Sequence, residues 1–147
     1  MADAPRKSLQ LKYELAGAGP QQAGDEPSRC ILVVDDDADI TRFIGAVLAS
    51  RGFRTVTAYD AIQGFLVAQQ QHPRLILVDW HMPGGGGAQL LRKLRDNHQT
   101  SAIPVVVVTS DSAPNLREEA ASLGAKFFLH KPLDSDRLAD LVAQFIA

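Results

Sequence analysis

Short apolar runs alternate with one-sided apolar stripes from Cys30 to the end of the chain. The clearest run is Leu75–Val78, whose consecutive apolar residues predict a strand buried on both faces, as in the centre of a parallel sheet. Less regular runs predict four more strands, at residues 31–34, 53–58, 105–108 and 127–129. Apolar residues at helical spacing predict helices around residues 40–48, 61–71, 90–97, 115–122 and 134–146.

This alternation of strands and helices predicts an α/β fold: a doubly wound, five-stranded parallel sheet with helices on both faces. The more polar run at 53–58 is predicted at a sheet edge, and Gly52 is predicted to end the helix before it. Asp134 is a predicted N-cap for the last helix. Phe127 and Phe128 are predicted to be core aromatic residues.

Residues 1–29 are rich in Pro and Gly, with balanced charges, and we predict a flexible N-terminal extension there. Within it, apolar and polar residues alternate at 9–15, a short strand-like pattern that either adds to a sheet edge or stays disordered. Residues 30–147 are predicted to form one domain.

The net charge and the lengths of the apolar runs indicate which kinds of partner the chain binds. The formal net charge of −2 gives no electrostatic reason for direct DNA binding. Apolar runs fall short of the roughly 18 residues of a membrane helix, and no signal peptide is recognisable. We therefore expect a cytoplasmic chain with a protein partner and no membrane contact. The single cysteine, Cys30, is predicted to be a buried filler.

Polar residues follow the predicted strands at the points where the strands end. Asp35 and Asp36 follow the first strand, Asp79 the third, Thr109 the fourth, and Lys131 lies beyond the fifth. Because the carboxyl ends of parallel strands share one edge of a sheet, these side chains are expected to converge. Carboxylates that converge repel one another unless a cation is shared, and hard oxygen ligands suit Mg²⁺. With a hydroxyl and an ammonium, the set fits phosphoryl transfer.

These motifs are similar to those of one known family. Val33-Val34-Asp35-Asp36, the run 78–83, Thr109 and Lys131-Pro132, with spacings of 43, 30 and 22 residues between Asp36, Asp79, Thr109 and Lys131, resemble the receiver domain of two-component response regulators. The resemblance covers residues 30–147 and implies a flavodoxin-like sheet with strand order 2-1-3-4-5. It also implies a stand-alone, single-domain response regulator whose output is supplied by another protein.

The resemblance implies a phosphorelay function. Asp79 would accept a phosphoryl group from a phosphohistidine of a sensor histidine kinase or a histidine phosphotransfer protein. Asp35, Asp36, Asp79 and the backbone oxygen of His81 would hold Mg²⁺. The chain would be a phosphoacceptor that assists its own phosphorylation and dephosphorylation rather than an enzyme acting on other substrates.

The remaining site residues follow from the same resemblance. Thr109 and Lys131 would bind the phosphoryl group, and the Lys131–Pro132 peptide bond would be cis. Thr109 and Phe128 would switch the face formed by the fourth helix, the fifth strand and the last helix, for docking to an effector or for onward transfer. His81 and Asp111 would set the lifetime of the aspartyl phosphate.

One departure and two alternatives accompany this interpretation. Glycines at 84–87 replace the usual residues after Pro83, which predicts an unusually mobile loop. Asp37-x-Asp39-x-Thr41 also resembles the signature of haloacid-dehalogenase-like phosphatases, with Asp37 as nucleophile, although Asp37 does not directly follow its strand. The other alternative is a receiver-like module that binds proteins without being phosphorylated.

Overall fold

The computed structural model describes residues 30–83 and 85–146. Within them a five-stranded parallel sheet has the order β2-β1-β3-β4-β5, as predicted. The strands are β1 (Cys30–Val34), β2 (Arg54–Ala58), β3 (Leu75–Val78), β4 (Val105–Thr109) and β5 (Phe127–His130). The predicted extension over residues 1–29, with its alternating stretch at 9–15, lies outside the described residues.

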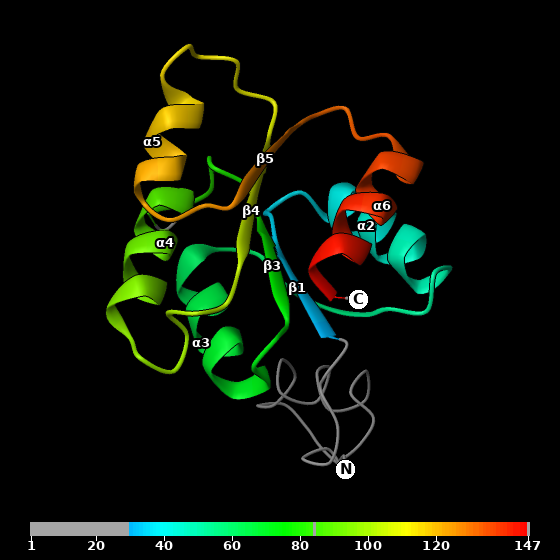
Figure 1. Cartoon of the computed structure of the whole chain (residues 1–147), viewed down its shortest axis with the longest axis horizontal. Helices are drawn as coiled ribbons and strands as arrows, with labels where there is room; N and C mark the ends of the chain where they lie inside the picture. The colour runs from blue at the N-terminus through cyan, green and yellow to red at the C-terminus, as the bar shows by residue number, and fades with distance from the viewer. Residues whose placement is uncertain (1–29, 84, 147) are drawn as a thin grey trace.

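Helices cover both faces of the sheet, in agreement with the doubly wound prediction (Figure 1). One face carries α2 (Ala38–Ala49) and α6 (Ser135–Ile146), and the other carries α3 (Ala61–Gln71), α4 (Gly86–Asp96) and α5 (Leu116–Ser122). In the described parts of the chain, no helix combines the length and the apolar character needed to cross a membrane.

Each face of the sheet has its own core because successive strand residues point to opposite sides. In β1, Leu32 and Val34 join the core under α3, α4 and α5, whereas Ile31 and Val33 join the core under α2 and α6. Every residue of β1, β3 and β4 is buried. This explains their uninterrupted apolar runs, since each fully buried aliphatic side chain contributes roughly 1.5–3 kcal/mol.

Aspartates fix the starts of three helices. The carboxylates of Asp37, Asp60 and Asp134 accept backbone N–H groups in the first turns of α2, α3 and α6. The predicted N-cap role of Asp134 is thus confirmed. Gly52 ends α2 as predicted: its φ is 88°, and the N–H groups of Gly52 and Phe53 donate to Ala49 and Leu48 of the last turn.

The prediction that Phe127 is a core residue was wrong. Its side chain is 42% exposed, whereas Phe128 is buried and Leu129 packs under α6. Phe127 is exposed because it is the first residue of β5, which is an edge strand. Helix α6 packs on Leu129 but does not cover Phe127.

Candidate functional site

Two strand ends bring the carboxylates of Asp35 and Asp79 together. Asp35 extends β1 by donating its N–H to Ala58 at 3.1 Å, and Asp79 extends β3 by donating to Val34 at 2.9 Å. Both side chains are buried. Neighbouring parallel strands therefore present two acidic groups side by side, as the convergence argument predicted.

Lys131 directly follows the edge strand β5, and its side chain extends to this pair. Its ammonium hydrogen bonds to Asp35 Oδ2 at 2.9 Å and lies 3.6 Å from Asp79 Oδ2. The other Asp35 oxygen accepts the N–H of Asp37 at 2.9 Å. The Lys131–Pro132 peptide bond is cis, as the resemblance implied. The lysine thus bridges two buried carboxylates.

The environment of Asp79 disfavours its charged form. Burial and the neighbouring charge of Asp35 raise the pKa of Asp79, while Lys131, the His81 N–H and the Thr109 hydroxyl act in the opposite direction. Burial alone would lower the pKa of Lys131, but its hydrogen bond to Asp35 and the two negative charges raise it. The site therefore holds a strongly basic cation beside a carboxylate that is costly to keep ionised.

Asp36 completes an acidic cluster. Carboxylate oxygens of Asp35, Asp36 and Asp79 lie within 4.8 Å of one another, and Asp36 is exposed. The His81 N–H donates to Asp79 Oδ1 at 3.4 Å, so the His81 peptide lies beside the cluster. Hard oxygen donors in this number suit a small divalent cation that keeps several waters.

Thr109 is the last residue of β4 and is buried at the same edge of the sheet. Its hydroxyl oxygen accepts the N–H of Asp111 at 3.2 Å. Phe128 is buried in the core under α3, α4 and α5, and the Arg117 guanidinium lies 4.7 Å from the centre of its ring. Phe128 is therefore already turned inward in this structure.

His81 and Asp111 form a contact that the sequence did not predict. His81 Nε2 lies 2.5 Å from Asp111 Oδ2, and this hydrogen bond lowers the pKa of Asp111. The contact joins the loop after β3 to the loop after β4. Sequence reasoning placed each residue near the reacting group separately. The only signal in the sequence was that a basic residue, His81, and an acidic residue, Asp111, each lie two residues beyond a predicted site residue, Asp79 and Thr109.

Glycines set α4 against the end of β3. The Gly87 N–H donates to the Trp80 carbonyl at 2.8 Å, and a Cβ on Gly87 would lie 2.8 Å from the Asp79 carbonyl oxygen. The glycine run thus permits a close backbone approach, and α4 begins inside it at Gly86. Unusual mobility of this loop stays a prediction.

Asp37 does not belong to the carboxylate cluster. It is exposed, and its side chain caps α2 by accepting the N–H groups of Asp39 at 2.9 Å and Ile40 at 3.4 Å. The phosphatase alternative, which needs Asp37 as nucleophile, is therefore not favoured.

Comparisons with known proteins agree with this geometry. The model of the response regulator receiver domain matches residues 31–143. Protein PilH of Pseudomonas aeruginosa is 32% identical over 117 residues, covering 80% of this chain and 97% of PilH. The phosphate regulon transcriptional regulatory protein PhoB of Escherichia coli is 35% identical over 111 residues, 76% of this chain and 48% of PhoB. The chain thus spans about half the length of PhoB.

Solved structures share the fold. The chemotaxis protein CheY4 of Vibrio cholerae superposes with a TM-score of 0.76 at 24% identity, covering 81% of this chain and 99% of CheY4. The strand order, the family match over residues 31–143 and the near-complete coverage of PilH all agree. The chain therefore belongs to the response regulator receiver domain family.

Proposed function

We propose that Asp79 is the phosphoacceptor of a phosphorelay. An Asp79 carboxylate oxygen attacks the phosphorus of a phosphohistidine, a P–O bond forms, and the P–N bond breaks. The electron pair of that bond stays on the imidazole nitrogen, which takes up a proton. The observation that carries the proposal is that Asp79 lies in a carboxylate cluster with Asp35 and Asp36, 3.6 Å from the ammonium of Lys131.

The other site residues position and neutralise charge. Asp35, Asp36, Asp79 and the backbone oxygen of His81 would hold Mg²⁺, which when bound offsets negative charge between the carboxylates and the incoming phosphoryl oxygens. The Lys131 ammonium, which lies 3.6 Å from Asp79 Oδ2, would move from Asp35 to an oxygen of a phosphoryl group on Asp79. Thr109, buried at the same edge, would donate its hydroxyl to another phosphoryl oxygen.

The lifetime of the phosphoryl group is assigned to His81 and Asp111. Hydrolysis returns Asp79 to a carboxylate when water attacks the phosphorus and the acyl phosphate P–O bond breaks. The His81–Asp111 contact joins the two loops that flank Asp79, so it limits the approach of that water. The chain would thus assist its own phosphorylation through Asp35, Asp36 and Lys131 and would set the rate of its own dephosphorylation through this contact.

The partners follow from this chemistry. A sensor histidine kinase or a histidine phosphotransfer protein would donate the phosphoryl group, and an effector protein would read the result. Thr109 and Phe128 would couple the added charge to the face formed by α5, β5 and α6. Phe128 supports this assignment because it lies between Arg117 on α5 and the core of the sheet.

Intact mass spectrometry tests the proposal. The chain is incubated with Mg²⁺ and acetyl phosphate or phosphoramidate, and an adduct of about 80 Da, one phosphoryl group, is expected. The adduct should be absent from Asp79→Asn and present in Asp37→Asn, the matched acidic control. No adduct on the native chain would support the unphosphorylated binding module, and an adduct that needs Asp37 would support the phosphatase alternative.

A further inference from the structure

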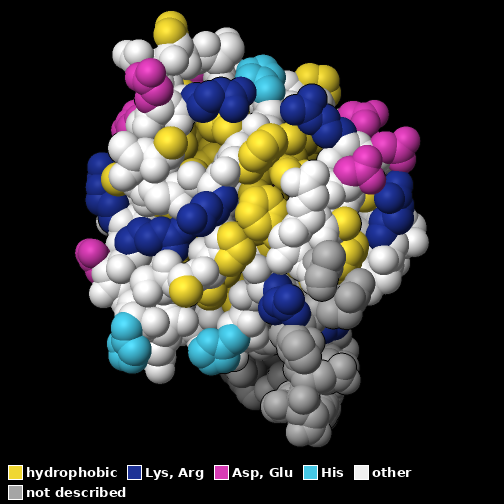
Figure 2. Space-filling view, viewed as in Figure 1, with side chains coloured by type: hydrophobic (Ala, Val, Ile, Leu, Met, Phe, Trp, Pro, Cys, Tyr) yellow, Lys and Arg dark blue, Asp and Glu magenta, His cyan; other side chains and the backbone are white. Residues whose placement is uncertain are grey.

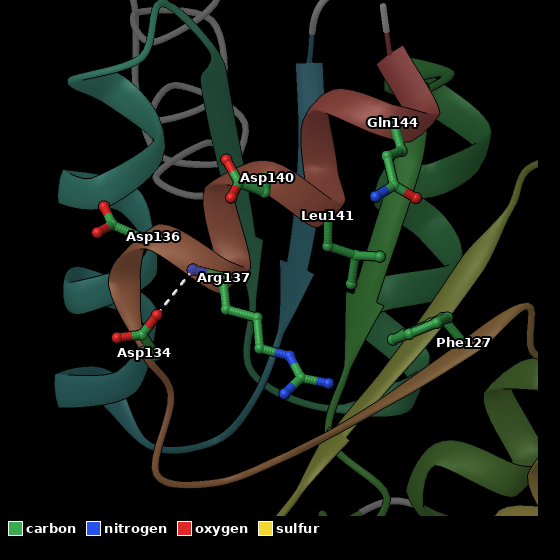
Figure 3. A pocket seen from close by; sticks show the side chains of 7 residues that line it. All are labelled: Phe127, Asp134, Asp136, Arg137, Asp140, Leu141 and Gln144. Carbon is green, nitrogen blue, oxygen red and sulfur yellow. Dashed lines mark hydrogen bonds between the residues drawn. The ribbon is translucent and has the colours of Figure 1, made fainter.

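A groove lies between α6 and β5, with a volume of about 370 Å³ (Figure 3). Its apolar part is formed by Phe127 at the start of β5 and Leu141 on α6. Phe127 is 42% exposed although it is a large apolar side chain. An exposed aromatic side chain in a concave surface is typical of a binding site rather than of a solvated face.

Acidic side chains surround this apolar part. Asp134 directly precedes α6, Asp136 and Asp140 lie on it, and all three are exposed. Figure 2 shows this side of the molecule, with an apolar band across its middle and acidic side chains gathered near α6. The groove therefore combines an apolar centre with a negative border.

The three carboxylates differ in their existing partners. Asp134 caps α6 by accepting the Arg137 N–H at 2.9 Å, and Asp136 pairs with Arg51, in the turn after α2, at 2.9 Å. The carboxylate of Asp140 makes no hydrogen bond or ion pair within residues 30–83 and 85–146. Its charge is thus fully available to a partner.

The groove is lined by three carboxylates and one cationic side chain, that of Arg137. Figure 3 shows the Arg137 guanidinium lying away from the carboxylates of Asp134, Asp136 and Asp140. The lining therefore keeps a net negative charge that long-range electrostatics would match to a basic partner.

The groove also borders an open sheet edge. Among the described residues β5 pairs only with β4, so the backbone groups on its other edge are not used within the sheet. An open edge beside an apolar side chain is the surface to which extended protein segments bind. Every lining residue except Leu141 is exposed, so a small molecule would leave most of its surface in water.

We propose that this groove binds a segment of a partner protein that carries a bulky apolar side chain flanked by Lys or Arg. The apolar side chain packs on Phe127 and Leu141, and the basic residues pair with Asp140 and its neighbours. The inference rests on the proposed function in so far as it takes this partner to be the effector. Phe127 directly precedes Phe128, the proposed switch residue, and Asp134 lies three residues beyond Lys131, so both walls are close in sequence to residues of the proposed site.

The test is a selection from a random 12-residue peptide library displayed on phage, followed by anisotropy measurements with the selected peptides as synthetic probes. We expect Lys or Arg beside Phe, Trp or Leu to be enriched on the native chain. Asp140→Lys should weaken the affinity of those peptides at least tenfold, whereas Asp96→Lys, which reverses an exposed acid on α4 outside the groove, should change it less than twofold. Enrichment of acidic peptides, no enrichment, or equal effects of the two variants would overturn the proposal.

Two further outcomes would assign the groove to another occupant and also overturn it. One is concentration-dependent self-association that Asp140→Lys abolishes, because a second copy would then fill the groove. The other is tighter peptide binding after Leu11→Ser and Tyr13→Ser in the full chain, because residues 9–15 would then compete for it.

Phosphorylation is measured separately on the same samples. The peptide measurements are made before and after acetyl phosphate treatment, with the phosphoryl adduct monitored by mass. A missing adduct contradicts the proposed function, and the peptide result on the unmodified chain still decides the groove. An adduct without groove-dependent peptide binding contradicts the inference alone.

Discussion

The ammonium of Lys131 donates a hydrogen bond to the carboxylate of Asp35 at 2.9 Å although the two residues lie 96 positions apart in the chain. Both side chains are largely buried, and Asp79 lies 3.6 Å from the same ammonium. The lysine therefore offsets two buried negative charges in the unphosphorylated protein. This stabilising role is separate from any role in binding a phosphoryl group.

Lys131→Met should lower the free energy of unfolding at pH 7 by about 2 kcal/mol, because it leaves two buried carboxylates without their cation. Urea denaturation without Mg²⁺ measures the change. Lys126→Met removes an exposed lysine just before β5 and serves as the matched control, with an expected change below about 0.5 kcal/mol. Adding Asp79→Asn to Lys131→Met should restore part of the loss. Equal effects of the two lysine variants would show that the bridge contributes nothing.

Asp79→Asn should stabilise the protein at neutral pH. Burial and the charge of Asp35 raise the pKa of Asp79 above its value in the unfolded chain. A carboxyl whose folded pKa is raised costs nothing at a pH below its unfolded pKa; its cost grows as the pH rises from the unfolded pKa and is complete above the folded pKa. The variant removes that cost, so its free energy of unfolding should exceed the native value by on the order of 1 kcal/mol at pH 7.

The pH dependence makes this prediction specific. The difference between Asp79→Asn and the native chain should shrink toward zero as the pH falls to about 4, near the reference pKa of an aspartate. Urea denaturation at several pH values, without Mg²⁺, measures it. A difference that stays constant with pH would mean that the gain comes from packing or hydrogen bonding instead of the buried charge.

The sequence was sufficient for the parts of the fold that apolar patterning determines. Leu75–Val78 was predicted as a central strand because burial on both faces leaves no room for polar residues, and the structure agrees. Phe127 was misassigned because an apolar residue at the start of an edge strand has the same sequence pattern as a core residue. Whether a residue of an edge strand is buried depends on the length and position of the helix that packs beside it, and the local sequence pattern does not determine either.

Some features of the candidate site were likewise predictable from the sequence, and others were not. Asp35, Asp79, Thr109 and Lys131 were predicted to converge because strand topology alone brings them to one edge. The His81–Asp111 contact was not predicted, because it depends on side-chain rotamers and on the paths of two loops. The close approach at Gly87 was missed for a related reason: the sequence indicated only a flexible run, not which backbone atoms it would contact.

Mg²⁺ should change the fluorescence of Trp80 in a saturable manner. Trp80 is the single tryptophan, it is buried, and it directly follows Asp79. Asp36→Ala removes one carboxylate of the cluster and should weaken the apparent Mg²⁺ affinity at least about tenfold. Asp37→Asn is the matched control, since Asp37 is acidic and adjacent but caps α2. An equal loss of affinity in both variants would point to general electrostatics and away from a defined site.

His81→Ala and Asp111→Ala should each speed the loss of the phosphoryl group from Asp79 by about threefold to tenfold, because either change breaks the contact between the two loops. The double variant should decay at the same rate as the single ones if the two residues act as one unit. Loss of the phosphoryl adduct is followed by mass after the donor is removed, with the exposed His98→Ala as the control. Unchanged rates in both single variants, or independent additive effects, would contradict the idea.

Gly87→Ala should destabilise the protein by about 1–3 kcal/mol and slow phosphorylation by acetyl phosphate. The added Cβ would lie 2.8 Å from the Asp79 carbonyl oxygen and 3.0 Å from the Trp80 Cα, both backbone atoms, and their displacement is expected to shift the Asp79 carboxylate. Gly45→Ala is the matched control within α2, where a Cβ would meet only the Thr55 hydroxyl at 3.3 Å. It should be neutral or stabilising, because alanine favours a helix interior by roughly 1 kcal/mol over glycine. If both substitutions stabilise the chain and leave the phosphorylation rate unchanged, the close approach of α4 to β3 does not position Asp79.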